Sequence, residues 1–225
     1  MVALPGPVTL SMLPHTPFAA RLAREAHARG KEIMLHLPME SVEPRPLGPG
    51  GVTLHMGQAE FTRRVRANLA AVPHVRGVNN HMGSLLTLHP GHMSWLMDEL
   101  RQRGGLYFVD SRTTPASVAL PVAQEYGVPS ATRDVFLDPV REAGAIQLQW
   151  ERALAKARRA GHAIVIGHPY PETLALLERE LPRLAARGFR LVPVSAMIAQ
   201  NTKRSPDLWH ASLSPLPPAA KNSKP

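Results

Sequence analysis

The sequence predicts an α/β protein whose strands form a mainly parallel sheet. Short apolar runs alternate along the chain with stretches whose apolar residues recur at helical spacing. Glycine follows most of the helical stretches, where it commonly ends a helix. The apolar runs show no polar alternation, which indicates strands buried on both faces. Strands of this kind, separated by helices, belong to a barrel or to an open sheet covered by helices on both faces.

The first half of the chain contains four predicted strands, over residues 7–13, 32–37, 75–79 and 106–109. The predicted helices between them cover residues 18–29, 58–71 and 92–103. Gly30 and Gly104 follow the first and the last of these helices and act as C-caps. Pro38 closes the second strand, and the Pro/Gly-rich segment 43–51 is a loop.

The second half continues the same alternation, with helices predicted over residues 117–126, 145–160 and 172–187 and strands over 163–166 and 190–194. Residues 1–200 therefore form one predicted domain, a size that buries enough apolar surface to be stable. Residues 201–225 are rich in Pro, Ser and Lys, which predicts a disordered tail.

The composition is that of an ordinary globular protein, with 44% hydrophobic and 19% charged residues. No apolar run reaches the roughly 20 residues that a membrane-spanning helix needs, so no transmembrane segment is predicted. The chain has no cysteine, which excludes disulfides and thiolate metal sites. No Gly-rich phosphate-binding motif follows a strand, so nucleotide binding has no support.

The formal net charge of +9 raises the question of nucleic-acid binding. The arginines are spread over several helices with acids among them, as Glu151 lies near Arg158. Aromatic residues make up only 5% of the chain, too few for base-stacking platforms. We therefore expect solvated helix faces and no nucleic-acid partner. The alternative, a nucleic-acid binder, predicts an affinity that falls steeply with salt.

Polar side chains recur where the predicted strands end. His36 ends the second strand, His81 follows the third, Asp110 the fourth and His168 the strand over 163–166. The carboxyl ends of parallel strands converge on one face, where catalysis resides in α/β folds. The neighbouring polar residues Asn79, Asn80 and Ser111 are expected on the same face. The other histidines are expected to be structural: His15, His27, His55, His74, His89, His92 and His162.

Imidazoles and carboxylates are suitable zinc ligands, although no short metal-binding motif is present. Asp110 is a candidate base or histidine-orienting residue, and its alternative role is to cap the following turn. Asp134 and Asp138 are further candidates that could instead pair with Arg112 or Arg133. Ser84 and Ser111 lack the G-x-S-x-G signature of a nucleophile.

Several segments resemble the divergent polysaccharide deacetylase family, namely LHLPME (35–40), GVNNHMGS (77–84), FVDSRTTPASVA (108–119), RDVFLD (133–138), IGHPYPETLALLERELPRL (166–184) and LVPVSAM (191–197). The resemblance implies a distorted (β/α) barrel of the glycoside hydrolase/deacetylase type. It also implies a divalent metal, commonly zinc, and removal of acetyl groups from a polysaccharide or peptidoglycan-like glycan of the cell envelope.

By the same resemblance His36 and His81 are metal ligands, Asp110 belongs to the acid–base machinery and His168 is the general acid. The expected substrate-binding or supporting residues are Asn79, Asn80, Ser84, Ser111, Arg112, Asp134 and Asp138.

The family's opening strand, which ends in an Asp-Asp-x-Gly element with a metal-binding Asp, has no counterpart here. The first predicted strand, PVTLSML, resembles the family's second strand instead. One explanation is a natural start upstream, which implies a periplasmic or secreted protein. The other is a chain that starts at Met1, is cytoplasmic, and is either an inactive glycan-binding domain or dependent on a partner strand. The oligomeric state is left open.

Overall fold

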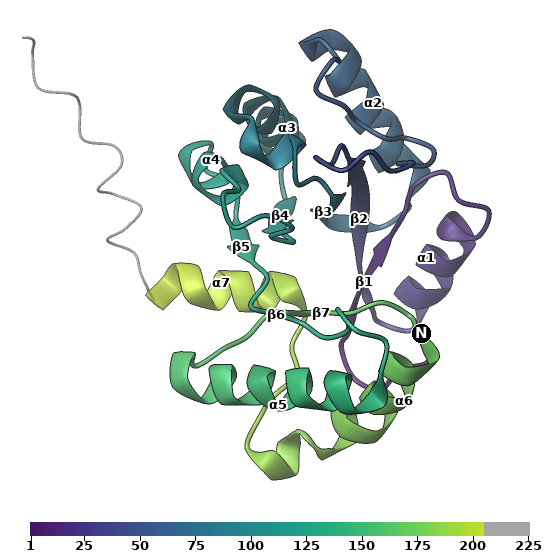
Figure 1. Cartoon of the computed structure of the whole chain (residues 1–225), viewed down its shortest axis with the longest axis vertical. Coiled ribbons are helices and arrows are strands. Elements are labelled where there is room, and N and C mark those ends of the chain that lie inside the picture. Colours follow the sequence, from purple (N-terminus) through teal and green to yellow (C-terminus); the bar gives the residue numbers. More distant parts are fainter. Residues whose placement is uncertain (205–225) are drawn as a thin grey trace, which may run out of the picture.

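The structure is a computed structural model that describes residues 1–204 (Figure 1). Five parallel strands form a sheet in the order in which they occur along the chain: β1 (Thr9–Met12), β2 (Glu32–Met39), β3 (Val75–Met82), β4 (Tyr107–Asp110) and β5 (Ser130–Thr132). A second parallel pair consists of β6 (Val135–Phe136) and β7 (Val165–Ile166). The predicted α/β class with a parallel sheet is confirmed.

Helices connect the strands and cover the outer side of the curved sheet, as Figure 1 shows for α1 to α4. The α-helices are α1 (Ala19–Ala28), α2 (Gln58–Ala71), α3 (Pro90–Arg103), α4 (Ala119–Glu125), α5 (Ala143–Ala160), α6 (Pro171–Glu180) and α7 (Val194–Arg204). Single 3₁₀ turns cover Leu86–Leu88, Leu181–Arg183 and Ala185–Arg187. No helix in this part of the chain combines the length and apolar character needed to cross a membrane.

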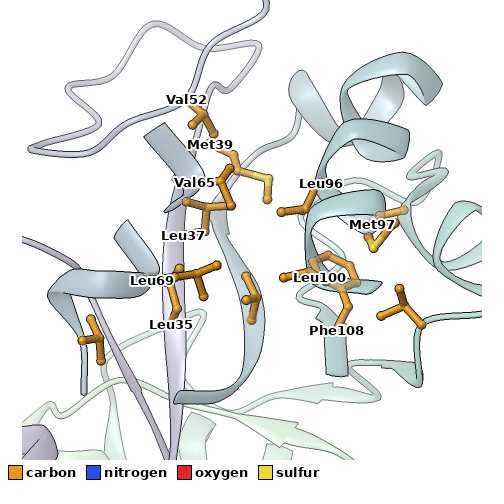
Figure 2. Packing of buried hydrophobic residues seen from close by; sticks show 14 of the residues in the cluster. Leu35, Leu37, Met39, Val52, Val65, Leu69, Leu96, Met97, Leu100 and Phe108 are labelled. Atoms are coloured by element: carbon orange, nitrogen blue, oxygen red, sulfur yellow. The ribbon is translucent and has the colours of Figure 1, made fainter. Parts of the chain in front are cut away.

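The main core lies between the sheet and the helices α1 to α4. Alternate β2 side chains are fully buried there, and Figure 2 shows Leu35, Leu37 and Met39 facing side chains of α2 and α3. Part of the opposite face of the sheet is apolar as well, because Met34 packs with Met197 of α7. Burial on both faces explains why the strands read as continuous apolar runs.

The two ladders are joined by one continuous piece of chain. The N–H of Arg133 donates to the carbonyl of Asp110 (2.9 Å), and the next residue, Asp134, donates its N–H to Ile164 (2.8 Å). The strand order thus continues from β5 to β6 and β7, so that the strands follow an arc. In residues 1–204 no ladder pairs β7 with β1, and hydrogen bonding does not close the arc into a full barrel.

β2 and β3 run past their predicted ends, to Met39 and Met82, so Pro38 does not close β2 and His81 lies within β3. The largest other differences lie in the last third of the described residues. Segment 190–194 does not form a strand. α7 begins at Val194, whose N–H donates to the side-chain hydroxyl of Thr9 and not to a backbone carbonyl of β1. The helix predicted over 172–187 ends at Glu180 and continues as 3₁₀ turns. α7 extends to Arg204, so residues 201–204 are helical and not tail; the rest of the predicted tail, 205–225, lies outside the described residues.

Candidate functional site

The pairing of β2 with β3 brings two predicted site histidines together. His36 stands opposite Asn79, and Pro38 opposite His81, so both imidazoles project from the same face at the strand ends. His36 Nε2 and His81 Nδ1 are 3.1 Å apart, and the rings meet edge to face at 65°. Two residues 45 positions apart in the sequence thus form one contact.

Asn79 connects this pair to the neighbouring strands. Its Oδ1 faces His36 Nδ1 at 3.0 Å and also accepts the Ser11 hydroxyl at 2.5 Å. Its Nδ2 donates to Ser111 Oγ at 3.1 Å. Because Asn79 Oδ1 is an acceptor, we assign the proton of His36 to Nδ1, which leaves a lone pair on Nε2. Asn79 therefore fixes the direction in which His36 presents that lone pair.

Ser11 was not among the predicted site residues. It lies on β1, on the face that it shares with Met34 of the neighbouring strand. The signal that points to it is a hydroxyl near the carboxyl end of the mainly apolar run PVTLSML, one residue before β1 ends. A polar side chain at that position needs a buried partner, which Asn79 supplies.

Both imidazoles are neutral at ordinary pH. Burial, followed by the nearby His81, lowers the pKa of His36 to about 3, although the bond to Asn79 opposes the shift. Burial and the charge of His168 also lower the pKa of His81. Neutral imidazoles carry the free lone pairs that bind metal ions or accept protons.

His168 forms the second half of the site with Asp138. Its Nδ1 lies 2.9 Å from Asp138 Oδ1, and its backbone N–H donates to Oδ2 at 2.6 Å. The Thr173 hydroxyl also donates to Oδ2, at 2.8 Å. Burial alone would raise the pKa of Asp138, but these hydrogen bonds outweigh it and hold that pKa below its usual value. Asp138 therefore remains ionised and orients the His168 ring through Nδ1.

The two halves lie close enough to influence each other, since the charge of His168 lowers the pKa of both His36 and His81. Two aromatic rings flank His168: Phe136 at 5.5 Å and Tyr170 at 5.3 Å between ring centroids. The site thus combines three imidazoles and a buried carboxylate with two aromatic walls.

Asp110 lies at the same end of the sheet, but its carboxylate caps the following turn. Its Oδ1 accepts the N–H of Arg112 at 2.7 Å, and its side chain is almost fully buried. This is the turn-capping role that the sequence also allowed. No hydrogen bond joins Asp110 to His36, His81 or His168 in the described part of the chain. Its catalytic role stays a prediction.

The other predicted supporting residues organise the loops. Asn80 accepts the N–H of Ser111 (2.8 Å) and donates to the Met82 carbonyl (2.7 Å). Ser84 accepts the N–H of Val42 at 3.1 Å, which joins the loop after β2 to the loop after β3.

Asp134 and Asp138, the two further candidates, do not form the ion pairs with Arg112 or Arg133 that the sequence allowed as an alternative. Asp138 binds His168, and Asp134 pairs with Lys156 (3.3 Å) and accepts the N–H of Ile164 (2.8 Å). The pairing of β6 with β7 brings both carboxylates to backbone N–H groups at the two ends of β7, those of Ile164 and His168.

The imidazole pair matches the donor chemistry of zinc, and its two facing nitrogens are both uncharged. A catalytic zinc usually has three protein ligands. No group of three or more His, Asp or Glu side chains that could hold a metal occurs among the described residues. The side chains present are thus of the type that binds zinc, and they supply two ligands, His36 and His81.

Comparison with known proteins assigns the chain to a family. The family model for divergent polysaccharide deacetylases matches residues 1–198. An uncharacterized protein from Haemophilus influenzae is 39% identical over 182 residues, which is 81% of this chain and 65% of that protein. The uncharacterized protein YibQ from Escherichia coli is 37% identical over 198 residues, or 88% of this chain and 61% of YibQ. The chain thus spans less than two thirds of these curated relatives.

A solved structure supports the fold. The crystal structure of an uncharacterized protein from Agrobacterium tumefaciens C58 matches with a TM-score of 0.82 at 25% identity, covering 86% of this chain and 79% of that one. Because the family model covers nearly the whole described region, the chain belongs to the divergent polysaccharide deacetylase family.

Proposed function

We propose that this protein is a metal-dependent hydrolase that removes acetyl groups from a polysaccharide or peptidoglycan-like glycan of the cell envelope. The observation that carries the proposal is a pair of neutral imidazoles, His36 and His81, beside a histidine oriented by a buried carboxylate. Membership of the deacetylase family supports the same chemistry. The expected substrate places the protein in the periplasm or outside the cell.

In this proposal His36 and His81 hold a divalent metal, with zinc the best match to imidazole ligands. A metal held by these two residues would polarise the acetyl carbonyl and would lower the pKa of a water molecule. Asn79 keeps His36 in the tautomer that presents a lone pair. The ligand geometry thus depends on Asn79 as well as on the histidines.

His168 is the proposed general acid, which protonates the leaving amine or hydroxyl through Nε2. Its Nδ1 is engaged by Asp138, so Nε2 is the nitrogen left for the substrate. A buried carboxylate that orients a histidine in this way is a recurrent device of hydrolases. Phe136 and Tyr170, whose rings both contact His168, provide apolar surfaces against which a sugar ring can pack.

The test is the variant His81→Ala, with metal content and acetate release measured on acetylated chito-oligosaccharides and on peptidoglycan. We expect loss of both bound metal and acetate release, with the fold retained by circular dichroism. His27→Ala is the matched control. His27 lies in the last turn of α1, just before β2 begins, whereas the candidate site lies near the opposite end of β2. Unchanged metal content in His81→Ala contradicts the ligand assignment.

A second function is favoured by one observation, the lack of a three-ligand metal group in residues 1–201. On this alternative the domain binds an envelope glycan without hydrolysing it. The same measurements separate the two: metal binding with acetate release identifies an enzyme, and glycan binding without either identifies a binding domain.

A further inference from the structure

Two arginines stand at the edge of the site. Arg112 follows β4 with a backbone φ of 52°, a left-handed conformation that costs energy for any residue with a Cβ. Its N–H is held by Asp110 (2.7 Å) and its carbonyl by Arg133 Nη2 (3.0 Å). The side chain is exposed. The loop therefore fixes Arg112 in a strained backbone conformation with its side chain toward solvent.

Arg133 is held in place by backbone acceptors and an aromatic ring. Its Nε donates to the carbonyl of Ser111 at 2.7 Å, and its guanidinium carbon lies 5.3 Å from the centroid of the Phe136 ring. Ser111 in turn accepts from Asn79, and Phe136 contacts His168. Arg133 thus touches one neighbour of each half of the candidate site.

The guanidinium of Arg133 lies against the backbone of Arg112, because its Nη2 donates to the Arg112 carbonyl. Burial, and then the charge of Arg112, lower the pKa of Arg133, while Asp110 and Asp134 act in the opposite direction. Both acids are already engaged, Asp110 by the Arg112 N–H and Asp134 by Lys156. In residues 1–201 neither arginine forms an ion pair, whereas Arg141 nearby is paired with Glu172 (3.8 Å).

We propose that Arg112 and Arg133 bind a carboxylate of the substrate, so that the substrate is an acidic acetylated glycan with a carboxylate near the acetyl group. This inference rests on the proposed function and names the substrate class of the same site. A planar guanidinium matches the two oxygens of a carboxylate, and a bound anion relieves the repulsion between the two cations. The Asp110 carboxylate binds the Arg112 N–H, and Asp134 directly follows Arg133, so two acids stand beside the pair and a singly charged carboxylate fits better than a doubly charged phosphate.

The test compares two tetrasaccharides with the same acetylated backbone. Chitotetraose is neutral, whereas the tetrasaccharide of alternating N-acetylglucosamine and N-acetylmuramic acid, without stem peptides, carries lactyl carboxylates. Dissociation constants are measured by calorimetry for the whole chain and for Arg112→Gln. We expect the acidic tetrasaccharide to bind about tenfold more tightly to the unmodified protein, the ratio that one charge-assisted contact produces. That ratio should fall to near one in Arg112→Gln.

Two further variants serve as controls for this experiment. Arg112→Gly removes the same charge and accepts the positive φ without strain, so a loss of preference there cannot come from misfolding. Arg152→Gln removes an exposed arginine from the middle of α5 and should keep the full preference.

Equal affinity for the two tetrasaccharides in the unmodified protein, or an unchanged ratio in both Arg112 variants, overturns the carboxylate site. Acetate release is measured on both glycans in parallel. Its absence from both would overturn the proposed hydrolase, while the affinity ratio still decides whether the arginines bind an anion.

Discussion

His168 illustrates how one hydrogen bond sets the chemistry of a side chain. With Nδ1 bound to Asp138, only Nε2 is available to the substrate. His168→Ala should therefore lower the turnover of acetate release by about a hundredfold or more, the usual effect of losing a general acid. Metal content should change little. Parallel measurements of kcat and bound metal check this, and a large loss of metal would instead identify His168 as a ligand.

The carboxylate of Asp138 accepts three hydrogen bonds, two from His168 and one from Thr173. Asp138→Asn keeps the shape but removes the charge. At about pH 7 we expect the free energy of unfolding to fall by roughly 1.5–3 kcal/mol, the range for hydrogen bonds to a charged group. Denaturant titration measures this loss.

The pH dependence of that loss follows from the lowered pKa of Asp138. A folded pKa below the unfolded one, about 3.9, gives stability that is complete above that value. The contribution disappears as the pH falls through the folded pKa. The difference in unfolding free energy between Asp138→Asn and the unmodified protein should thus shrink below about pH 4. A difference that stays constant as the pH falls well below about 4 would rule out the charge as its source.

At the residue scale, position along a strand predicted more than residue type did. His36, His81 and His168 were identifiable because each follows an apolar run, and the structure gathers all three. The role of Asp110 could not be predicted from its position in the same way. The carboxylate of Asp110 accepts the N–H of Arg112, two residues further along the chain, and only the conformation of that turn decides between capping and catalysis.

At the scale of the element, β3 depends on a residue without a side chain. Gly77 stands opposite Tyr107 of β4, and a Cβ on Gly77 would lie only 2.3–2.6 Å from atoms of the Tyr107 ring. The ring is buried, and its hydroxyl donates to Glu32 at 2.7 Å, so it has little room to move. Gly77→Ala should therefore destabilise the fold by about 1–3 kcal/mol, as overpacked cores do.

Gly144, in the first turn of α5, is the control for this substitution, since a Cβ there meets nothing within 4 Å. Gly144→Ala should be neutral or add up to about 1 kcal/mol of stability. Chemical denaturation of both variants measures the two values. Similar effects of the two substitutions would show that the Tyr107 ring does not confine Gly77.

The elements that were predicted well are those with strong local signals. α2 matches its predicted bounds, and α3 and α5 begin within two residues of theirs. β5 and β6 were missed because strands of three and two residues are too short to show a periodic pattern. Segment 190–194 was overpredicted because an apolar extended segment that leads into a helix has the composition of a strand.

At the scale of the whole molecule, the strand order could be expected but the path of the arc could not. Consecutive strands joined by helices usually become neighbours, which gives the observed order β1 to β5. The step from β5 to β6 depends on Asp134 and Ile164, 30 residues apart, whose pairing leaves no local trace in the sequence. The same step brings Asp138 and His168 to the site.

The distribution of charge over the molecule gives the last prediction. Despite the net charge of +9, many arginines pair with acids on their own helix, for example Arg29 with Glu25, Arg64 with Glu60 and Arg101 with Asp98. Such paired faces neutralise few phosphates and therefore release few counterions. At about 150 mM salt we expect a dissociation constant for duplex DNA weaker than roughly 100 μM, measured by fluorescence anisotropy. Micromolar binding that persists at that salt concentration would favour the nucleic-acid alternative over a glycan substrate, since it would require a cluster of unpaired cations able to follow a phosphate backbone.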